Sequence, residues 1–149
     1  MVDVRPLREE DREPWEELSR GYHAFYGRTI PPEFYARTWA RISAGNELQA
    51  LGAVLDGALV GIAHYFRHPR FWFEDVVYLQ DLFVEERARG LGAGRALIEA
   101  VAERARAAGA GRLYWHTKAG NEPARRLYDS VAAHTGFIRY DYALSGDAT

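Results

Sequence analysis

The chain has 149 residues, 48% of them hydrophobic, and a formal net charge of −2 at pH 7. This length suits one globular domain over residues 1–149, and the near-neutral charge is not typical of a nucleic-acid-binding protein. No apolar run reaches the roughly 18 residues that cross a bilayer, and the charged residues 1–15 do not resemble a signal peptide. The absence of cysteine excludes disulfides and thiolate metal ligands. We therefore expect a cytoplasmic protein without a bound metal, a nucleic-acid partner or a membrane partner.

The first half of the chain predicts a strand, two helices and a hairpin. Hydrophobic periodicity and breaker residues place these elements, in chain order, at residues 2–5, 11–26, 33–43, 48–55 and 58–66. Asp11 is expected to cap the first helix, since its side chain can accept a backbone N–H there. Asp56 and Gly57 both tolerate a positive φ, which favours a tight turn between the last two strands.

The second half predicts the order strand, glycine turn, helix, strand, helix and strand, so the chain is a mixed α+β protein. The near-continuous apolar character of residues 76–84 predicts a strand that is buried on both faces. The helix after the glycines ends at residues 109–111 and has one apolar stripe: Leu97, Ile98, Val101, Ala105 and Ala108. Further strands are expected at residues 113–117 and, singly or as a pair, at residues 136–144. Between them, Asn121 is expected to cap a helix that buries Ala124, Leu127, Tyr128 and Val131.

The turn Arg89-Gly90-Leu91-Gly92-Ala93-Gly94 lies between the predicted strand 76–84 and the helix that follows it. Glycines let the backbone turn sharply and expose successive N–H groups without obstruction by a Cβ atom. Together with the positive end of the helix dipole and the charges of Arg89 and Arg95, these groups favour a bound anion. The turn therefore predicts a pyrophosphate site. The alternative is a glycine-rich turn that binds nothing.

Two other phosphate-binding patterns do not fit this turn. A dinucleotide-binding fold has Gly-x-Gly-x-x-Gly after its first strand and an acidic residue about 20 positions later. Here the spacing is Gly-x-Gly-x-Gly after the fourth strand, and the next strand ends in Trp115-His116-Thr117 without a carboxylate. No Gly-Lys-Ser/Thr follows, so a Walker-type loop is also excluded. A nicotinamide dinucleotide is therefore the less favoured ligand.

The glycine turn resembles the acetyl-CoA pyrophosphate loop of the GCN5-related N-acetyltransferase superfamily, whose pattern is Arg/Gln-x-x-Gly-x-Gly/Ala. Val4-Arg5-Pro6-Leu7 followed by Asp11 is similar to the first strand and helix start of that family. Asn121-Glu122-Pro123-Ala124 with Leu127-Tyr128 resembles its second signature, Asn-x-x-Ala-x-x-Leu-Tyr. The order of elements agrees over essentially the whole chain. The resemblance implies a central, mostly antiparallel, twisted sheet of six to seven strands, splayed at strands 4 and 5 and flanked by about four helices.

Within the superfamily, residues 78–84 and 121–123 look most like the diamine and polyamine acetyltransferases. Residues 113–117 and 136–140 are more similar to a fungal and bacterial subgroup, whose yeast members are described as acetylating histones and polyamines or D-amino acids. The chain departs from the polyamine enzymes because Gln80 stands where they usually carry Glu. Its ending is longer than the usual Tyr-x-x-x-Gly-Phe, with Tyr128 eight positions before Gly136, which favours the fungal-like subgroup.

The resemblance implies acetyl-CoA as the cosubstrate and suggests which residues bind it. One strand would pair with the pantetheine arm, the glycine turn would hold the pyrophosphate, and the second signature would complete the set: Leu82, Phe83, Val84, Arg89, Gly90, Leu91, Gly92, Ala93, Gly94, Arg95 and Asn121. A backbone N–H of that strand would polarise the acetyl carbonyl. Tyr128 would protonate the departing thiolate as general acid. Without the preceding Asn121 at the motif distance, a tyrosine at this helical spacing is more often a core residue.

Acetyl transfer to an amine requires a neutral nucleophile. An alkylamine has a pKa of about 10.4, so its deprotonation at neutral pH costs about 4–5 kcal/mol, and a carboxylate can take the proton directly or through water. Asp81 is the first candidate for this base, with Glu74 and Asp75 nearby in the sequence; Asp81 can equally be a structural hydrogen-bonding carboxylate. Gln80 cannot accept a proton and could only orient a substrate or a water.

Aromatic residues offer two candidate walls for the acceptor. The first is Phe71-Trp72-Phe73, which can contact an ammonium face-on but is equally a loop anchor or subunit contact. The second lies around the predicted helix–helix loop: Tyr22, Phe25, Tyr26 and Tyr35. The histidines lack metal-ligand spacing and are expected in the core or on the surface: His23, His64, His68, His116 and His134.

The sequence thus predicts an acetyl-CoA-dependent N-acetyltransferase that acts directly on a primary amine. Acidic residues near the site favour a polyamine, an amino acid or another small cationic amine over a protein lysine. Two alternatives stay open: a non-catalytic acyl-CoA-binding regulatory module and a dinucleotide-binding protein. Because relatives often dimerise through their C-terminal strands, we also expect a homodimer that uses residues 137–144.

Overall fold

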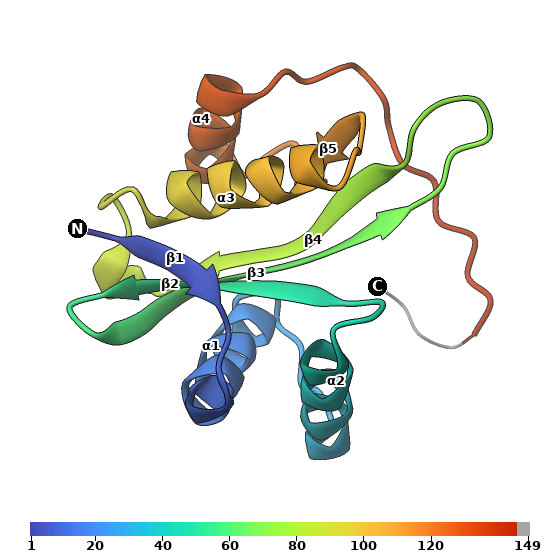
Figure 1. Cartoon of the computed structure of the whole chain (residues 1–149). Coiled ribbons are helices and arrows are strands. Elements are labelled where there is room, and N and C mark those ends of the chain that lie inside the picture. Colours follow the sequence, from blue (N-terminus) through green and yellow to red (C-terminus); the bar gives the residue numbers. More distant parts are fainter. Residues whose placement is uncertain (146–149) are drawn as a thin grey trace. The chain divides into compact units, whose positions relative to one another are not determined.

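The computed structural model describes residues 1–145, which form helices and one sheet of five strands (Figure 1). Contacts within the chain define two compact units, Met1–His116 and the part that starts at Thr117. The elements of the first unit are β1 (Asp3–Pro6), η1 (Glu9–Asp11), α1 (Arg12–Phe25), α2 (Pro32–Ala44), β2 (Gln49–Leu55), β3 (Ala58–His68), β4 (Val76–Val84), η2 (Glu86–Ala88), α3 (Ala93–Ala107) and β5 (Arg112–Tyr114). The second unit contains α4 (Glu122–Val131). No helix within residues 1–145 has both the length and the apolar character needed to span a bilayer.

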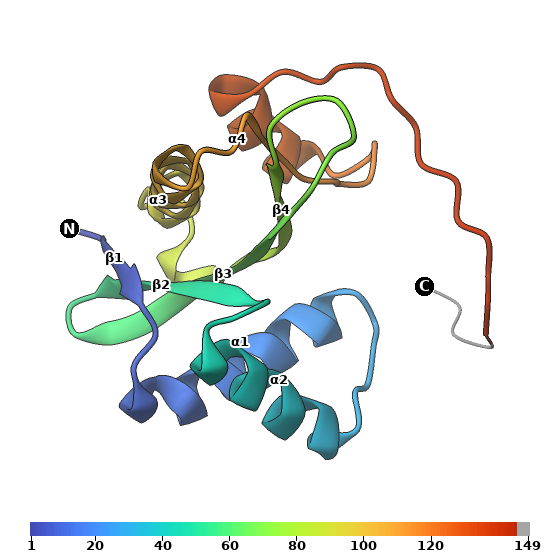
Figure 2. The ribbon, with the colours of Figure 1, turned by 45° about the vertical axis from the view of Figure 1, so that its right-hand side comes forward.

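The sheet of the first unit has the strand order β1-β2-β3-β4-β5. Neighbouring strands run antiparallel from β1 to β4, whereas β5 runs parallel to β4 because α3 crosses between them. The helices α1 and α2 cover one face of the sheet and α3 covers the other (Figures 1 and 2). Asp56 and Gly57 connect β2 to β3 with φ values of 50° and 79°, which confirms the predicted tight turn.

Apolar side chains on both faces of the sheet form the core. Against α1 and α2, the buried cluster consists of Trp15, Leu18, Tyr35 and Ile62. On α3, the predicted buried stripe is confirmed for Leu97, Ile98, Val101 and Ala105. The prediction is wrong for Ala108, which is exposed because α3 ends one residue earlier and Ala108 is its C-cap. Val76, Val77 and Leu79 are buried, so the predicted burial on both faces is confirmed for the first part of β4. It is wrong for the rest of the strand, where Gln80 is exposed and residues 81–84 are half-buried.

β4 and β5 part after a short paired stretch. Val76, Val77 and Tyr78 pair with residues 112–114, and no other strand in the described part of the chain pairs with this edge from Leu79 to Val84. The unpaired edge lies at the place where the splay between the fourth and fifth strands was predicted. β5 (Arg112–Tyr114) is therefore shorter than the strand that was predicted at residues 113–117.

The sheet has five strands, so the expectation of six to seven is wrong. Residues 136–144, predicted as a final strand or strand pair, form no strand. A strand needs the N–H and C=O groups of a neighbour, and α4 is the only regular element in the described residues of the second unit. The face of α4 that was predicted to be buried is only half-buried; it consists of Ala124, Leu127, Tyr128 and Val131.

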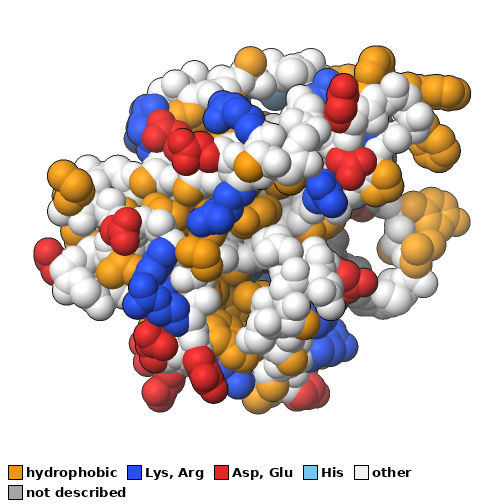
Figure 3. Space-filling model, in the orientation of Figure 1, with side chains coloured by type: hydrophobic (Ala, Val, Ile, Leu, Met, Phe, Trp, Pro, Cys, Tyr) orange, Lys and Arg blue, Asp and Glu red, His pale blue; other side chains and the backbone are white. Residues whose placement is uncertain are grey.

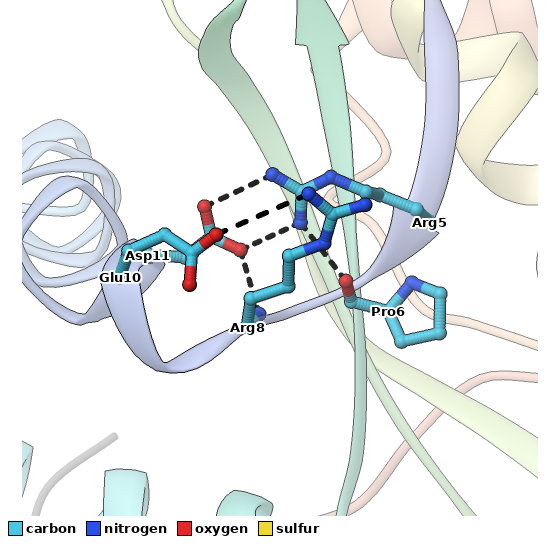
Figure 4. A network of polar contacts seen from close by, with 5 residues as sticks. All are labelled: Arg5, Pro6, Arg8, Glu10 and Asp11. Carbon is cyan, nitrogen blue, oxygen red and sulfur yellow. Dashed lines mark hydrogen bonds and ion pairs between the residues drawn. The ribbon is translucent and has the colours of Figure 1, made fainter.

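A bidentate ion pair ties β1 to the start of α1 (Figure 4). Nη1 and Nη2 of Arg5 donate to the Asp11 carboxylate over 2.6 Å and 3.1 Å, and the backbone N–H of Arg8 donates to it over 2.7 Å. Asp11 is the N-cap of α1, but its side chain makes no capping bond to the helix, contrary to the prediction, because Arg5 and Arg8 hold it. Hydrogen bonds from Arg5 lower the pKa of Asp11 against the opposing effect of burial.

Replacement of Asp11 by Asn should lower the free energy of unfolding by about 3 kcal/mol at pH 7, because it leaves the largely buried Arg5 charge without its partner. The folded-state pKa of Asp11 lies below its unfolded value of about 3.9. Its contribution is therefore complete above that pH and is lost as the pH falls through the folded-state pKa. Urea unfolding at a series of pH values measures this contribution of Asp11 to the free energy of unfolding. Glu10→Gln is the control, because Glu10 is exposed and 3.9 Å from Arg8, and an equal loss there would contradict the prediction.

Candidate active site

The glycine turn lies where η2 leads into α3. Gly90 and Gly92 have φ values of 80° and 88°, a conformation that is unfavourable for residues with a Cβ atom. A Cβ atom at either position would meet no other atom within 4 Å, so the turn faces open space. Ala93 begins α3 and is buried, which anchors the turn on the core. Because the first N–H groups of a helix have no partner within it, this turn suits an anion.

Arg89 is held at the end of β4 by its own side chain. Its Nε donates to the Val84 carbonyl over 3.0 Å. Its guanidinium lies 5.7 Å from the ring centroid of Phe83 and 6.0 Å from that of Phe25 on α1. Arg95 is exposed in the first turn of α3. The structure therefore brings both predicted arginines to the glycine turn, as the sequence spacing requires.

A β-bulge in β4 brings Asp81 opposite His64. The pairing with β3 joins His64 to Asp81 and then Tyr65 to Leu79, so Gln80 is the extra residue. Gln80 is exposed, whereas the Asp81 side chain is 28% exposed. Nδ1 of His64 lies 2.9 Å from Oδ2 of Asp81. This contact depends on the register of two strands and cannot be read from local sequence.

Asp81 also accepts a hydrogen bond from the hydroxyl of Tyr22 on α1. Burial raises the pKa of Asp81, but the hydrogen bond and the charge of His64, the hydrogen bond from Tyr22 and the charge of His23 together outweigh burial and hold that pKa below its ordinary value. Burial and the charge of Asp81 raise the pKa of Tyr22. At neutral pH, Asp81 is therefore an ionised carboxylate and Tyr22 is a neutral hydrogen-bond donor.

The other two candidate carboxylates lie at the opposite end of β4. Asp75 precedes the strand, and its carboxylate is 3.4 Å from Nε of Arg67. Glu74 is exposed in the β3–β4 loop. Asp81 lies six residues beyond Asp75 along an extended strand, in which each residue advances by about 3.3 Å. The structure therefore brings neither Glu74 nor Asp75 to Asp81.

The two aromatic walls predicted for the acceptor lie in different places. Phe71-Trp72-Phe73 forms the tip of the β3–β4 loop and is 69–96% exposed, where hydrophobic side chains project at the upper right of Figure 3. This tip lies beyond the paired residues of the hairpin and away from the bulge. In the second set, Tyr22 donates a hydrogen bond to Asp81, whereas Tyr35 is in the core. Phe25 and Tyr26 are exposed.

A cluster of rings that the sequence did not predict lies where β4 and β5 part. The ring of Tyr78 lies 5.6 Å from that of Phe66, 4.9 Å from that of Tyr114 and 5.4 Å from that of His116, between centroids. The Tyr78 hydroxyl is 3.1 Å from Nδ1 of His116. Sheet pairing brings these rings together. Within residues 1–145, no three His, Asp or Glu side chains gather in a way that could hold a metal ion.

Sequence reasoning missed two residues at the site, Trp15 and His64. Nε1 of Trp15 donates to Nε2 of His64 over 2.8 Å, while the other ring nitrogen of His64 faces Asp81. Trp15 is 49 positions from His64, and Asp81 is 17 positions from it. One signal was available, because His64 is the single histidine or charged residue in the otherwise apolar strand 58–66.

Asn121 and Tyr128 belong to the second unit. Asn121 is the N-cap of α4, but its Nδ2 donates to Oγ1 of Thr117 over 3.3 Å, so the predicted capping bond to the helix is absent. Tyr128 lies in the last half of α4 and is half-buried. The helix that carries this second signature therefore forms where it was predicted.

Comparison with known proteins now assigns the family. The model of the acetyltransferase (GNAT) family matches residues 7–132. The chain is 38% identical over 144 residues to D-amino-acid N-acetyltransferase HPA3 of Saccharomyces cerevisiae, which covers 93% of this chain and 89% of that protein. The chain therefore belongs to the acetyltransferase (GNAT) family and is an N-acetyltransferase. This assignment removes the dinucleotide-binding alternative.

Solved structures share the fold. Ribosomal-protein-alanine N-acetyltransferase from Brucella melitensis biovar Abortus 2308 matches with a TM-score of 0.81 and 26% identity, covering 97% of this chain and 100% of that one. AAC(6')-Iy in complex with the bisubstrate analogue CoA-S-monomethyl-acetylneamine matches with a TM-score of 0.85 and 20% identity, covering 97% and 99%. The likeness confirms the mixed α/β architecture.

Proposed function

We propose that this N-acetyltransferase moves an acetyl group from acetyl-CoA directly to the primary amine of a small cationic acceptor. The observation that carries the proposal is the ionised Asp81 carboxylate, held by His64 and Tyr22 at the start of the unpaired edge of β4. A donor that lies along this edge and an ammonium at Asp81 would be immediate neighbours. Glu74 and Asp75 do not share this position.

The donor side of the proposal rests on the edge of β4 and on the glycine turn. The unpaired edge offers the backbone groups of Leu82, Phe83 and Val84 to an extended arm that contains amides. The open turn and the start of α3 suit a pyrophosphate, with donors among Arg89, Gly90, Leu91, Gly92, Ala93, Gly94 and Arg95. Asn121 joins this set by family resemblance. Acetyl-CoA would supply the activated acyl group, and one backbone N–H of the edge would polarise its carbonyl.

The acceptor side is built around Asp81. Its charge would bind the ammonium, and its oxygen would take the proton directly or through water as the amine attacks. Gln80 is the extra residue of the bulge and would orient the acceptor or that water. The rings of Tyr22 and Tyr78 would add the cation–π attraction that favours an ammonium over a neutral amine.

The names of the relatives support a proposal for the class of acceptor. The yeast relative is named for D-amino acids, and the AAC(6')-Iy complex holds an analogue built on an acetylated aminoglycoside. We propose that an amino acid, a polyamine or another small cationic amine is the acceptor, in preference to a protein lysine. The higher identity to the yeast enzyme places D-amino acids first in the screen.

The replacement Asp81→Asn should lower kcat/KM for the best amine about 10²- to 10⁴-fold, because the amide can neither take the proton nor balance the ammonium charge. Thiol release from acetyl-CoA measures the rate over D- and L-amino acids, polyamines, aminoglycosides and a basic peptide. Asp75→Asn is the matched control, because the same change is made at the far end of β4. Equal rates in the two variants would remove Asp81 from the mechanism. A wild-type protein that acetylates no amine would favour the non-catalytic acyl-CoA-binding module.

Tyr128 is proposed as the general acid because it follows Asn121 at the spacing of the family's second signature. Tyr128→Phe should lower kcat about 10²-fold with little change in the KM for acetyl-CoA, since the hydroxyl would act only on the leaving thiolate. Tyr142→Phe is the control, because Tyr142 is 89% exposed in the same unit. A Tyr128→Phe enzyme with the wild-type kcat would assign the proton to another group.

We also propose that both units form one catalytic domain over residues 1–149, since the family match crosses their boundary.

We further propose that the protein is a cytoplasmic homodimer. The support for a dimer is an exposed segment with alternating apolar residues: Ile138, Tyr140, Tyr142 and Leu144. Light scattering should give twice the 16.9 kDa of one chain, and Tyr140→Arg should yield monomers. Phe71→Arg in the exposed β3–β4 loop is the control, and monomers from this variant instead would move the contact to that loop.

A further inference from the structure

The first unit contains a hydrogen-bonded chain that the proposed reaction does not yet use. It runs from Trp15 on α1 through His64 on β3 to Asp81 on β4. We propose that Trp15 and His64 are positioning residues: Trp15 holds His64 in one neutral tautomer, and His64 holds the Asp81 carboxylate toward the acceptor. This inference rests on the proposed function, in which Asp81 receives the ammonium of the acceptor.

The tautomer follows from the donor inventory of the two rings. The indole Nε1–H of Trp15 can only donate, and it lies 2.8 Å from Nε2 of His64. Nε2 is therefore an acceptor without a proton, and the single ring proton of neutral His64 is on Nδ1. That N–H points at Oδ2 of Asp81 over 2.9 Å. The chain of donors then runs in one direction, from the indole to the carboxylate.

The same geometry opposes a second proton on His64. A protonated Nε2 would set an N–H group against the N–H group of Trp15, so one of two buried donors would lose its acceptor. Neutral His64 gives Asp81 a hydrogen bond without giving it a counter-charge. The negative charge of Asp81 is thus left for the ammonium of the acceptor, whereas an imidazolium would compete with that cation.

Trp15 can impose this direction because it is fixed in the core. Trp15 is 1% exposed. The centroid of its ring lies 5.2 Å from that of Trp39 and 6.4 Å from that of Tyr35. The indole N–H therefore cannot turn toward water when His64 changes state. Tyr22 approaches Asp81 independently of this chain, from the next turns of α1.

The other titratable groups around the chain are few. Tyr22 and His23 face Asp81 from α1, and Tyr78 lies near Tyr22 on β4. The Nδ1 of His23 is 2.9 Å from the Tyr35 hydroxyl on α2. Burial lowers the pKa of His23, the charge of Asp81 opposes this effect, and the charges of Arg28 and His64 reinforce it. His23 is thus the second imidazole to follow in any titration of this site.

Nitrogen-15 NMR of the histidine rings in the full-length protein tests the tautomer without any substrate. The wild type should show neutral His64 with its proton on Nδ1. Trp15→Phe keeps most of the ring but removes the N–H donor, so the proton of neutral His64 should no longer be confined to Nδ1. Trp39→Phe is the matched control, because it changes the neighbouring ring and leaves the Trp15–His64 contact intact.

Kinetics test whether the chain positions Asp81. His64→Asn keeps an amide N–H near the position of Nδ1, whereas His64→Gln puts the amide near Nε2 and leaves Asp81 without this donor. The Gln variant should lose about tenfold to a hundredfold in kcat/KM, and the Asn variant should retain most of it. In Trp15→Phe, kcat/KM should fall because the His64 proton is no longer confined to Nδ1, and kcat/KM of Trp39→Phe should match that of the wild type.

Two results would overturn the inference. One is a wild-type His64 whose proton is on Nε2, or that is doubly protonated at pH 7. The other is equal activity in the Asn and Gln variants of His64, which would make the chain merely structural. The NMR experiment needs no turnover, so the two proposals can fail separately. If the protein acetylates no amine but His64 carries its proton on Nδ1, the proposed function is contradicted and the Trp15–His64 geometry is retained.

Discussion

The pairing of β3 with β4 sets the position of the acceptor carboxylate and of the unpaired strand edge beside it. One extra residue, Gln80, shifts the register so that Asp81 rather than Gln80 stands opposite His64. The same strand is left without a partner on its other edge beyond Tyr78, because β5 stops at Tyr114. A carboxylate for the acceptor and a backbone edge for the donor therefore belong to consecutive residues of one strand.

Two partly buried carboxylates in this chain are stabilised in different ways. Asp11 is paired with the Arg5 guanidinium, which cancels its charge and makes the pair a link between β1 and α1. Asp81 receives hydrogen bonds from an imidazole and a phenol. A neutral imidazole and a phenol can donate to the carboxylate without cancelling its charge. The difference explains why Asp81, and not Asp11, suits a cationic ligand.

The helix α1 links the two halves of the candidate site. Near its start, Trp15 contacts His64. In its last turn, Tyr22 binds Asp81, and Phe25 lies under the guanidinium of Arg89 at the glycine turn. One rigid element thus contacts the acceptor carboxylate, its positioning histidine and the arginine of the proposed pyrophosphate site. Packing of α1 on the sheet therefore affects donor and acceptor groups together.

The sequence by itself determined the features that depend on neighbouring residues. The glycine turn, the tight turn at Asp56 and Gly57 and the buried stripe of α3 were predictable because φ preferences and helical periodicity act within a few positions. Tertiary structure decided which residues meet across strands and helices. Trp15, His64 and Asp81 are far apart in the chain and meet through the register of β3 and β4 and the packing of α1. The strand expected at residues 136–144 did not form for the same reason, because a strand exists only where another backbone edge completes its hydrogen bonds.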